Sequence, residues 1–380
     1  MAPDAERTGD AELVAAGLYD PAAADAGERL ELLDYLLDQG CTLDDLVRAD
    51  AEGRLLSAAS DVMLRRGEPR LSRDEVAELA GIDPEDIPGA WRALGFPDPP
   101  AGAELWWPSD TELFASFALA ADLFGPDRVR QFSRVMGRAA AQVAEAAVAL
   151  FNSDVRAPLE EGTPPPVETA RANVAGQVAA EVIPRVFEAA FRHHVQATVQ
   201  RVDETTFSDD RRRPVLCVGF ADLVGSTELA HRLDPAATAR LATDIEQAAT
   251  DAVARASGRL VKTIGDGVLF TTPGPGAALA IADELVAWAT ADTRLDGLRV
   301  GMASGPVVWQ DGDVHGPVVN LAARLCAVAG GGQVLVDAAF AAAQEPGASP
   351  ALVPAGPMTL RGFADPVDTF TLPATPRSHP

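Results

Sequence analysis

The feature that most constrains the fold is an abrupt change of hydrophobic pattern near residues 202–213. From residue 26 to about residue 201, apolar residues recur at the spacing of α-helices, and no run alternates like a strand. From residue 214 onward, short β-branched apolar runs alternate with helical segments. The sequence therefore predicts a helical domain over 1–201, a polar linker over 202–213 and a mixed domain over 214–375.

Within the helical part, capping patterns and prolines mark where helices begin and end. Thr42 with Asp45, and Ser72 with Glu75, are capping-box pairs that predict helix starts. Three prolines at 164–166 separate two long alanine-rich helices. The predicted helices cover 28–40, a segment after Thr42, 72–80, 84–94, 127–151 and 167–202, and residues 96–110 are predicted to be a loop.

In the second part, the predicted elements follow the order β–α–β–β–α–β. Strands are expected at 214–222, 258–265, 267–273, 298–309 and 331–337, with helices at 229–257, 277–289 and 318–329 and a final strand pair near 358–363 and 368–372. This order is that of the ferredoxin-like plan, in which the sheet is mainly antiparallel. The fold class is therefore α+β, with an all-α domain first.

Charge and composition exclude several classes of protein. A net charge of −25 disfavours binding to nucleic acid or to anionic lipid. Residues 71–96 superficially resemble a helix-turn-helix, but acidic residues outnumber Arg73 and Arg92 there, so DNA binding is not expected. No apolar run reaches the roughly 20 residues of a membrane helix, and the polar N-terminus is no signal peptide, which favours the cytoplasm. Cys41, Cys217 and Cys326 are too far apart for a metal motif and are predicted to be buried thiols.

Two aspartates carry the first indication of chemistry. Asp222 ends the first predicted strand and Asp266 lies in the tight turn of the following hairpin, so the two can be neighbours and share metal ions. The backbone amides of Val224, Gly225, Ser226 and Thr227 can then surround phosphate groups. Either aspartate alone is more often a capping or turn residue, and only the pair within these motifs is informative.

Three stretches around these residues resemble the signature stretches of class III adenylyl cyclases. They are FADLVGST (220–227), VKTIGDGVLF (261–270) and DVHGPVVNLAARL (313–325). The resemblance spans roughly residues 214–343 and extends to LRGFADPVDTFTL (360–372). It implies an enzyme that converts ATP to cyclic AMP and pyrophosphate with two divalent ions, Mg²⁺ or Mn²⁺.

The resemblance also implies a role for each matching residue. Asp222 and Asp266 match the metal-binding aspartates, and Lys262 and Asp313 match the pair that recognises adenine. Asn320 and Arg324 match the pair that stabilises the transition state. The family further implies a head-to-tail homodimer, in which one chain supplies the two metal-binding aspartates and its partner supplies the other four residues.

The match has departures. Ser226 stands where many members carry phenylalanine, and Val314 and His315 replace bulkier residues before Gly316, which bears on the tightness of base selection. Arg361 is a candidate for the basic residue that touches the phosphates in the family, but a surface arginine is the favoured interpretation. The alternatives are a guanylyl cyclase, a catalytically silent nucleotide-binding switch and a DNA-binding regulator.

The helical part is similar to the regulatory domain of autoinhibited, pH-responsive actinobacterial cyclases. The similarity lies in residues 31–46 and in the helix over 179–202. It implies an intertwined helical dimer whose last helix assembles or dismantles the catalytic interface. His193 and His194 on that helix are candidate pH sensors, since histidine titrates near neutral pH. The apolar segments 111–124 and 147–151 can line a fatty-acid pocket or pack between helices.

Overall fold

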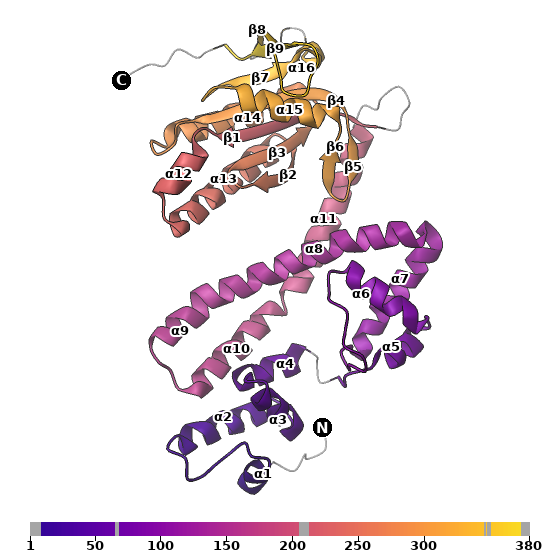
Figure 1. Cartoon of the computed structure of the whole chain (residues 1–380), viewed down its shortest axis with the longest axis vertical. Coiled ribbons are helices and arrows are strands. Elements are labelled where there is room, and N and C mark those ends of the chain that lie inside the picture. Colours follow the sequence, from indigo (N-terminus) through magenta and orange to yellow (C-terminus); the bar gives the residue numbers. More distant parts are fainter. Residues whose placement is uncertain (1–8, 65–67, 205–212, 346, 348–350, 374–380) are drawn as a thin grey trace. The chain divides into compact units, whose positions relative to one another are not determined.

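Figure 1 shows the computed structural model of the chain, which describes residues 9–64, 68–204, 213–345, 347 and 351–373. The chain divides into two compact units, Met1–His193 and His194–Pro380. The division falls inside one helix, α11 (Ile183–Glu204). Most of the predicted linker, residues 205–212, lies outside the described residues, so the predicted boundaries at 201 and 214 stay predictions.

The first unit consists of helices joined by loops, as its sequence pattern predicts. Its only described β-type pairing is an isolated bridge between Leu71 and Trp106. The helices are α1 (Asp10–Ala15), α2 (Ala26–Asp38), α3 (Leu43–Ala51), α4 (Ala58–Leu64), α5 (Arg73–Ala80), α6 (Ile87–Ala93), α7 (Thr111–Phe124), α8 (Pro126–Phe151), α9 (Ala157–Glu161), α10 (Pro166–Ala180) and α11, with short turns η1 (Leu55–Ser57), η2 (Pro84–Asp86), η3 (Pro108–Asp110) and η4 (Asn152–Arg156).

Two hydrophobic clusters hold this unit together. In the first, α2 and α3 bury leucines such as Leu33, Leu36 and Leu46 completely. The second gathers around Trp106 and Phe114, both 1% exposed, and includes residues of α5, α6 and α7. The predicted capping box of α3 is present, because Thr42 and Asp45 exchange side-chain to backbone hydrogen bonds. Helix starts were thus readable from the capping residues.

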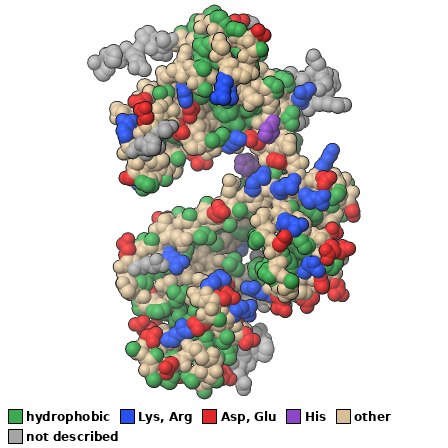
Figure 2. Space-filling view, in the orientation of Figure 1, with side chains coloured by type: hydrophobic (Ala, Val, Ile, Leu, Met, Phe, Trp, Pro, Cys, Tyr) green, Lys and Arg blue, Asp and Glu red, His purple; other side chains and the backbone are tan. Residues whose placement is uncertain are grey.

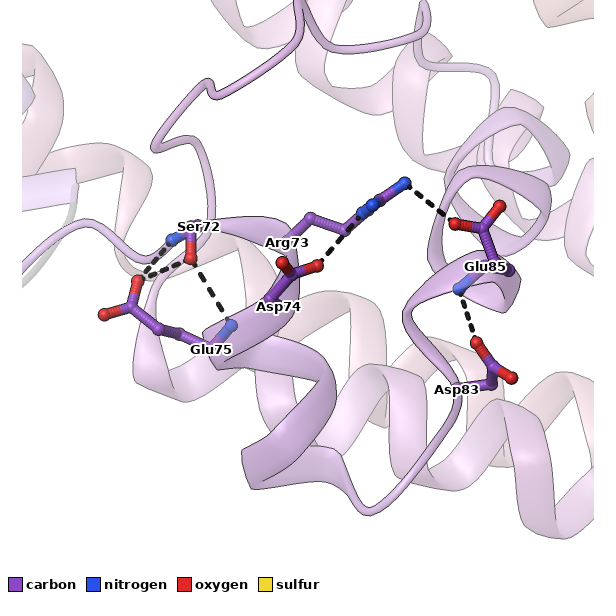
Figure 3. A network of polar contacts seen from close by, with 6 residues as sticks. All are labelled: Ser72, Arg73, Asp74, Glu75, Asp83 and Glu85. Carbon is purple, nitrogen blue, oxygen red and sulfur yellow. Dashed lines mark hydrogen bonds and ion pairs between the residues drawn. The ribbon is translucent and has the colours of Figure 1, made fainter.

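The α5–η2 segment shows how the helix-turn-helix-like stretch uses its charges (Figure 3). Ser72 caps α5 by accepting from the backbone N–H of Glu75, whose carboxylate accepts in return from Ser72. Arg73 forms ion pairs with two acidic residues, since its guanidinium lies 3.3 Å from the Asp74 carboxylate and 3.4 Å from that of Glu85. Acidic surroundings of this kind repel phosphates, which favours the prediction that the segment does not bind DNA.

The predicted continuous helix over 167–202 is wrong at one point. The structure divides it into α10 and α11, with Glu181 and Val182 between them. Pro184 explains the break, since its nitrogen has no hydrogen to donate to the carbonyl four residues earlier. The segment 111–124, for which no helix was predicted, forms α7.

The second unit is built on a seven-stranded sheet with the order β2-β3-β1-β4-β7-β9-β8. All neighbouring strands are antiparallel except β4 and β7. The strands are β1 (Val215–Leu223), β2 (Arg259–Ile264), β3 (Gly267–Thr272), β4 (Leu298–Pro306), β7 (Val334–Asp337), β8 (Val353–Met358) and β9 (Val367–Thr371). The order of the first four strands is that of the ferredoxin-like plan, which confirms the predicted α+β class.

Helices cover both faces of this sheet (Figure 1). Cys217 and Ala221 of β1 belong to the core cluster beneath α13 (Pro235–Arg255) and α14 (Pro275–Ala291). Leu216 and Val218 belong to the cluster beneath α15 (Pro317–Val328). The alternation along β1 is the two-residue period of a strand buried on both faces. The remaining helices are α12 (Ser226–Arg232) and α16 (Ala338–Ala343).

Three predicted elements of this unit need correction. The helix predicted over 229–257 is two helices, because Asp234 caps α13 and Pro235 occupies its first position. The strand predicted over 298–309 ends at Pro306, after which β5 (Val308–Gln310) and β6 (Asp313–His315) form a separate hairpin. The first strand of the final pair is β8, which ends where the predicted segment 358–363 begins.

The three cysteines are free and buried, as predicted. Burial raises the pKa of both Cys217 and Cys326 to about 12, so these thiols stay protonated near neutral pH. No helix in the described part of the chain combines the length and the apolar character that crossing a membrane requires.

Candidate active site

Strand pairing brings the two predicted metal-binding aspartates to one corner of the sheet. Ala221 of β1 pairs with Val268 of β3, so Asp222 lies beside Gly267, the residue that follows Asp266. A Cβ atom built on Gly267 would lie 3.8 Å from Asp222 Oδ1. The β2–β3 turn that carries Asp266 is tight, since Gly265 adopts φ 63°, a value that glycine adopts readily.

The Asp266 carboxylate has an atom that the protein leaves unsatisfied. Its Oδ2 is buried and has no hydrogen-bond partner among the described residues. A buried oxygen without a partner is unfavourable by about 1–3 kcal/mol, and a bound cation would satisfy it. Within the described residues, no group of three His, Cys, Asp or Glu side chains is placed to hold a metal unaided. Two carboxylates suit Mg²⁺ or a similar ion that completes its shell with substrate phosphates and water.

Arg299 is a member of the site that sequence reasoning missed. It lies opposite Asp222 in the β1–β4 register, and its Nε donates to Asp222 Oδ2 over 3.1 Å, while its Nη2 donates to the same oxygen. Its Nη1 donates to the carbonyl of Ala327. The hydrogen bond with Asp222 raises the pKa of the Arg299 guanidinium, so the cation is firmly held. A lone charged residue in the apolar strand LRVGMASG was the available signal.

The turn after β1 holds the predicted phosphate-binding amides. The Val224 amide donates to the carbonyl of Gly297 over 3.0 Å, so it already has a partner in this structure. Gly225 adopts φ 71° and immediately precedes α12, whose first two residues are Ser226 and Thr227. The prediction of a phosphate-binding turn therefore rests on the amides of these three residues.

Lys262 and Asp313 form an ion pair with each other, between β2 and β6. The Lys262 side chain is 41% exposed and that of Asp313 is 29% exposed, so both are open to a ligand. Partial burial would raise the pKa of Asp313, but the hydrogen bonds from Lys262 and from the Val314 amide hold it below its usual value. The carboxylate is therefore charged and acts as an acceptor.

Asn320 and Arg324 lie one turn apart on α15, and both are exposed. The helix is held tightly, because its backbone lies directly on β4 at Gly301. A Cβ atom at Gly301 would come within 2.0 Å of the Cys326 nitrogen and 2.5 Å of the Ala322 oxygen. Within the described part of the chain, the Arg324 guanidinium makes no ion pair.

The predicted residues thus form three groups rather than one cluster. The groups are the two aspartates with Arg299, the Lys262–Asp313 pair, and the two α15 side chains. Among the described residues, no hydrogen bond or ion pair joins one group to another. The candidate sensors His193 and His194 are exposed on α11, and Arg361 is exposed after β8.

Comparison with known families identifies both units. Residues 9–191 match the adenylate cyclase regulatory domain, and residues 209–374 match the adenylate and guanylate cyclase catalytic domain. The two matches follow one another along the chain as the two units do.

Similar proteins occur in actinobacteria. An uncharacterized protein of Mycobacterium tuberculosis is 35% identical over 375 residues, covering 96% of this chain and 94% of that protein. An adenylate cyclase of Streptomyces coelicolor is 34% identical over 281 residues, covering 72% of this chain and 71% of that protein. A protein of M. tuberculosis named pH-sensitive adenylate cyclase is 29% identical over 322 residues, covering 81% and 78% of the two chains.

Proposed function

The chain belongs to the class III adenylate cyclases, and from that premise we propose that its active site is shared between two copies of the chain. The enzyme forms 3′,5′-cyclic AMP and pyrophosphate from ATP. What remains to be assigned is which residues act, which ions assist them and how the helical domain controls them. The domain boundaries 1–201 and 214–375 and a location in the cytoplasm stay predictions of the sequence.

Asp222 and Asp266 are assigned to two divalent cations, Mg²⁺ or Mn²⁺. The observation that carries the assignment is the buried, unpartnered Oδ2 of Asp266 beside the Asp222 strand end. When bound, such cations lower the pKa of the ribose 3′ hydroxyl and offset the charge of the triphosphate. Arg299 offsets the charge of Asp222 and orients its carboxylate.

Lys262 and Asp313 are assigned to the adenine base. Adenine offers N1 as an acceptor and its N6 amine as a donor, which a lysine donor and a carboxylate acceptor complement. Guanine presents the opposite pattern on that edge, so the same pair would leave polar groups unsatisfied, and such mismatches discriminate strongly. This complementarity favours ATP over GTP, and turnover of the two nucleotides decides between an adenylyl and a guanylyl cyclase.

Arg324 and Asn320 are assigned to the reacting groups. The 3′ oxygen attacks the α-phosphorus, the bond to the pyrophosphate oxygen breaks and the 3′ hydroxyl proton is released. Arg324 neutralises the charge that builds on the α-phosphate, and Asn320 orients the ribose. Both side chains are exposed on a helix that is packed firmly on β4, so a nucleotide held by another chain can reach them.

A second copy of the chain accounts for two further observations. Among the residues that the structure describes, no hydrogen bond or ion pair joins the three groups of site residues within one chain. Large apolar side chains are also exposed on several long helices, and Figure 2 shows apolar side chains on the surface. On α11, Phe187, Phe191, Val195 and Val199 recur every four residues and are 45–56% exposed. In the proposed head-to-tail dimer, one chain supplies Asp222 and Asp266, and its partner supplies the other four residues.

The helical half is assigned to regulation of the catalytic half. A relative named pH-sensitive adenylate cyclase shares 29% identity, and His193 and His194 are exposed on α11 near the unit boundary. If they sense pH, replacing both by glutamine flattens the pH profile of activity. The apolar segments 111–124 and 147–151 expose side chains such as Leu123 and Leu150, which a second copy covers or, as the alternative, a fatty acid.

A complementation experiment tests the shared site. Asp222→Ala and Arg324→Ala are each expected to be inactive, since each breaks both sites of its own homodimer. After the two proteins are mixed and allowed to exchange subunits, half of the dimers are mixed and have one intact site, which restores about a quarter of the wild-type rate.

The matched control mixes Asp222→Ala with Asp266→Ala. Both changes affect the part of the site that one chain supplies, so no mixed dimer has an intact site and no recovery is expected. Recovery in the control, or none in the first mixture despite mass-spectrometric evidence of exchange, contradicts the shared-site proposal. Cyclic AMP formation with Mn²⁺ and ATP is the readout.

A further inference from the structure

The β5–β6 hairpin, which carries Asp313, is a small structure apart from the main sheet. Its register pairs Trp309 with Val314 and Gln310 with Asp313, and its two turn residues, Asp311 and Gly312, have φ values of 56° and 82°. Both values are those of a tight hairpin turn, and Asp313 follows that turn directly. A two-stranded ribbon is barely stable alone, so contacts outside the hairpin must fix its position.

The base of the hairpin is anchored, but its tip is not packed on the sheet. Val307 and Val314 are buried in the core beneath α15. Towards the tip, residues 309–312 line one side of a cavity of about 460 Å³, and Leu216 and Thr271 lie among the residues that line the rest of it. Because this space separates residues 309–312 from the strand ends, packing against the sheet does not hold the tip in place, and Asp313 lies between this tip and the buried Val314.

Two side chains of β2, those of Arg259 and Lys262, reach from the sheet to the hairpin instead. The guanidinium of Arg259 lies over the Trp309 ring, 4.1 Å from its centroid, and its Nη2 donates to the Gly312 carbonyl over 3.4 Å. Arg259 therefore contacts both the second residue of β5 and the turn. Lys262 is three residues later on the same strand and forms its ion pair with Asp313 of the hairpin. Figure 1 shows this hairpin projecting from the sheet beside β2 and β3.

We propose that Arg259 and Trp309 are positioning residues that set base selectivity by fixing Asp313 relative to Lys262. This inference rests on the proposed role of those two residues in recognising adenine. A donor and an acceptor discriminate between bases only while their spacing matches the base edge, and a shift of about 1 Å is enough to lose that match. Neither Arg259 nor Trp309 needs to touch the nucleotide.

The proposal makes a specific kinetic prediction. The contacts of Arg259 with Trp309 and with the Gly312 carbonyl are called the clamp below. Loosening the clamp leaves Asp222, Asp266 and Arg324 in place, so the chemical step is retained while recognition of the base is impaired. The KM for ATP is expected to rise more than kcat falls, and the ratio of kcat/KM for ATP to that for GTP is expected to fall. A merely structural role lowers kcat/KM for both nucleotides equally and leaves their ratio unchanged.

The experiment uses the full-length chain with Mn²⁺ and compares the ATP to GTP ratio across a set of variants. Trp309→Ala removes the ring, and at least about a tenfold fall in the ratio is expected, equal to about 1.4 kcal/mol of discrimination. Trp309→Phe keeps a ring and is expected to retain most of the selectivity. Arg259→Lys keeps the charge but loses the planar fork, so it gives an intermediate fall and serves as a second test if Trp309→Ala folds poorly.

Two reference variants separate the possible failures. Arg255→Ala alters an exposed arginine four residues before Arg259 that pairs with Glu284, and its ratio is expected to equal that of the wild type. Asp313→Ala removes the acceptor itself. If Asp313→Ala lowers the ratio but Arg259→Lys and folded Trp309→Ala do not, the clamp proposal is overturned alone. If Asp313→Ala leaves the ratio unchanged, the proposed base recognition is overturned together with it.

Discussion

The two halves of the chain differ in how completely each buries its own apolar residues. The catalytic unit packs both faces of its sheet, and Phe270, Leu335 and Phe340 are fully buried. The helical unit buries two cores as well, but its long helices leave large apolar side chains exposed. In the described residues these include Leu119, Leu123, Phe124, Phe132, Val148, Leu150, Val178, Val186, Phe187 and Phe191.

The difference follows from the geometry of the elements. A sheet with helices on both faces is a closed arrangement, because every apolar face meets another. A long helix such as α8 or α11 presents apolar residues on more than one side, so these residues are all buried only when several neighbouring elements pack against the helix. The catalytic half therefore covers both faces of its sheet by itself, whereas the helical half leaves apolar faces exposed, which the proposed dimer would cover. Four predictions test this distinction.

The largest expected effect is confined to the catalytic half and to activity. Asp266→Asn removes the charge that a cation needs but keeps the shape of the side chain, so kcat is expected to fall about a thousandfold, equal to about 4 kcal/mol. Stability is expected to be unchanged, because the Oδ2 atom has no partner among the described residues. Cyclic AMP formation, Mn²⁺ titration and thermal unfolding are the measurements, with exposed Asp283→Asn as the control. Normal turnover by Asp266→Asn would remove this residue from the metal site.

Core truncations test whether the halves unfold separately. Leu46→Ala in the helical unit and Leu335→Ala in the catalytic unit each truncate a fully buried side chain. Each is expected to lower the free energy of unfolding of its unit by about 3 kcal/mol. Calorimetry is expected to show two unfolding transitions, one for each unit. Each variant is expected to lower the midpoint temperature only of the unit that carries the substitution. A common shift of both transitions by either variant would show that the halves form one cooperative unit.

The exposed apolar row on α11 is expected to govern dimerisation. Replacing Phe187 and Phe191 by glutamate places charge where the second copy should pack, so the dimer dissociation constant is expected to rise at least about tenfold per substitution. Ala189→Glu puts the same charge on the same helix away from the row and is the control. Analytical ultracentrifugation measures the effect, and dimers of unchanged strength in the double variant would contradict the assignment of this face.

The smallest expected effect is local to one helix start. Ser72→Ala removes the hydroxyl that caps α5, and a loss of about 1 kcal/mol in the stability of the helical unit is expected. Activity at saturating ATP should not change. Chemical denaturation of the variant is compared with Ser72→Thr, which keeps the hydroxyl and should retain most of the stability. An equal loss of stability in the two variants would show that the Ser72 hydroxyl does not stabilise the helix start.

Local signals in the sequence predicted much of the fold. Capping residues such as Thr42 and Ser72 marked real helix starts, and the strand order followed from the β–α–β–β–α–β pattern. Two helix breaks were missed at Pro184 and Pro235, although proline is the strongest available signal. The segment 111–124 was not predicted as a helix because its own apolar residues lie on all sides of the helix, which hides the helical period.

The partner of Asp222 across the sheet was the part of the site that the sequence could not supply. Arg299 lies 77 residues from Asp222, and only the β1–β4 register brings them together. The ion pair between Lys262 and Asp313 depends in the same way on a hairpin that was not predicted. The chemistry of a residue is readable from its motif, whereas its partner depends on register, which no local pattern specifies.

The close approach at Gly301 has a consequence for how such an enzyme can be switched. The backbone of α15 lies so close to β4 that any side chain at position 301 would push the helix away from the sheet, since its Cβ atom would come within 2.0 Å of the Cys326 nitrogen. If the proposed regulation by the helical half operates, we therefore expect an activating signal to move the catalytic half as one rigid body. Such a signal would change how the two catalytic units of the proposed dimer meet, while the packing of α15 on β4 within each unit is kept.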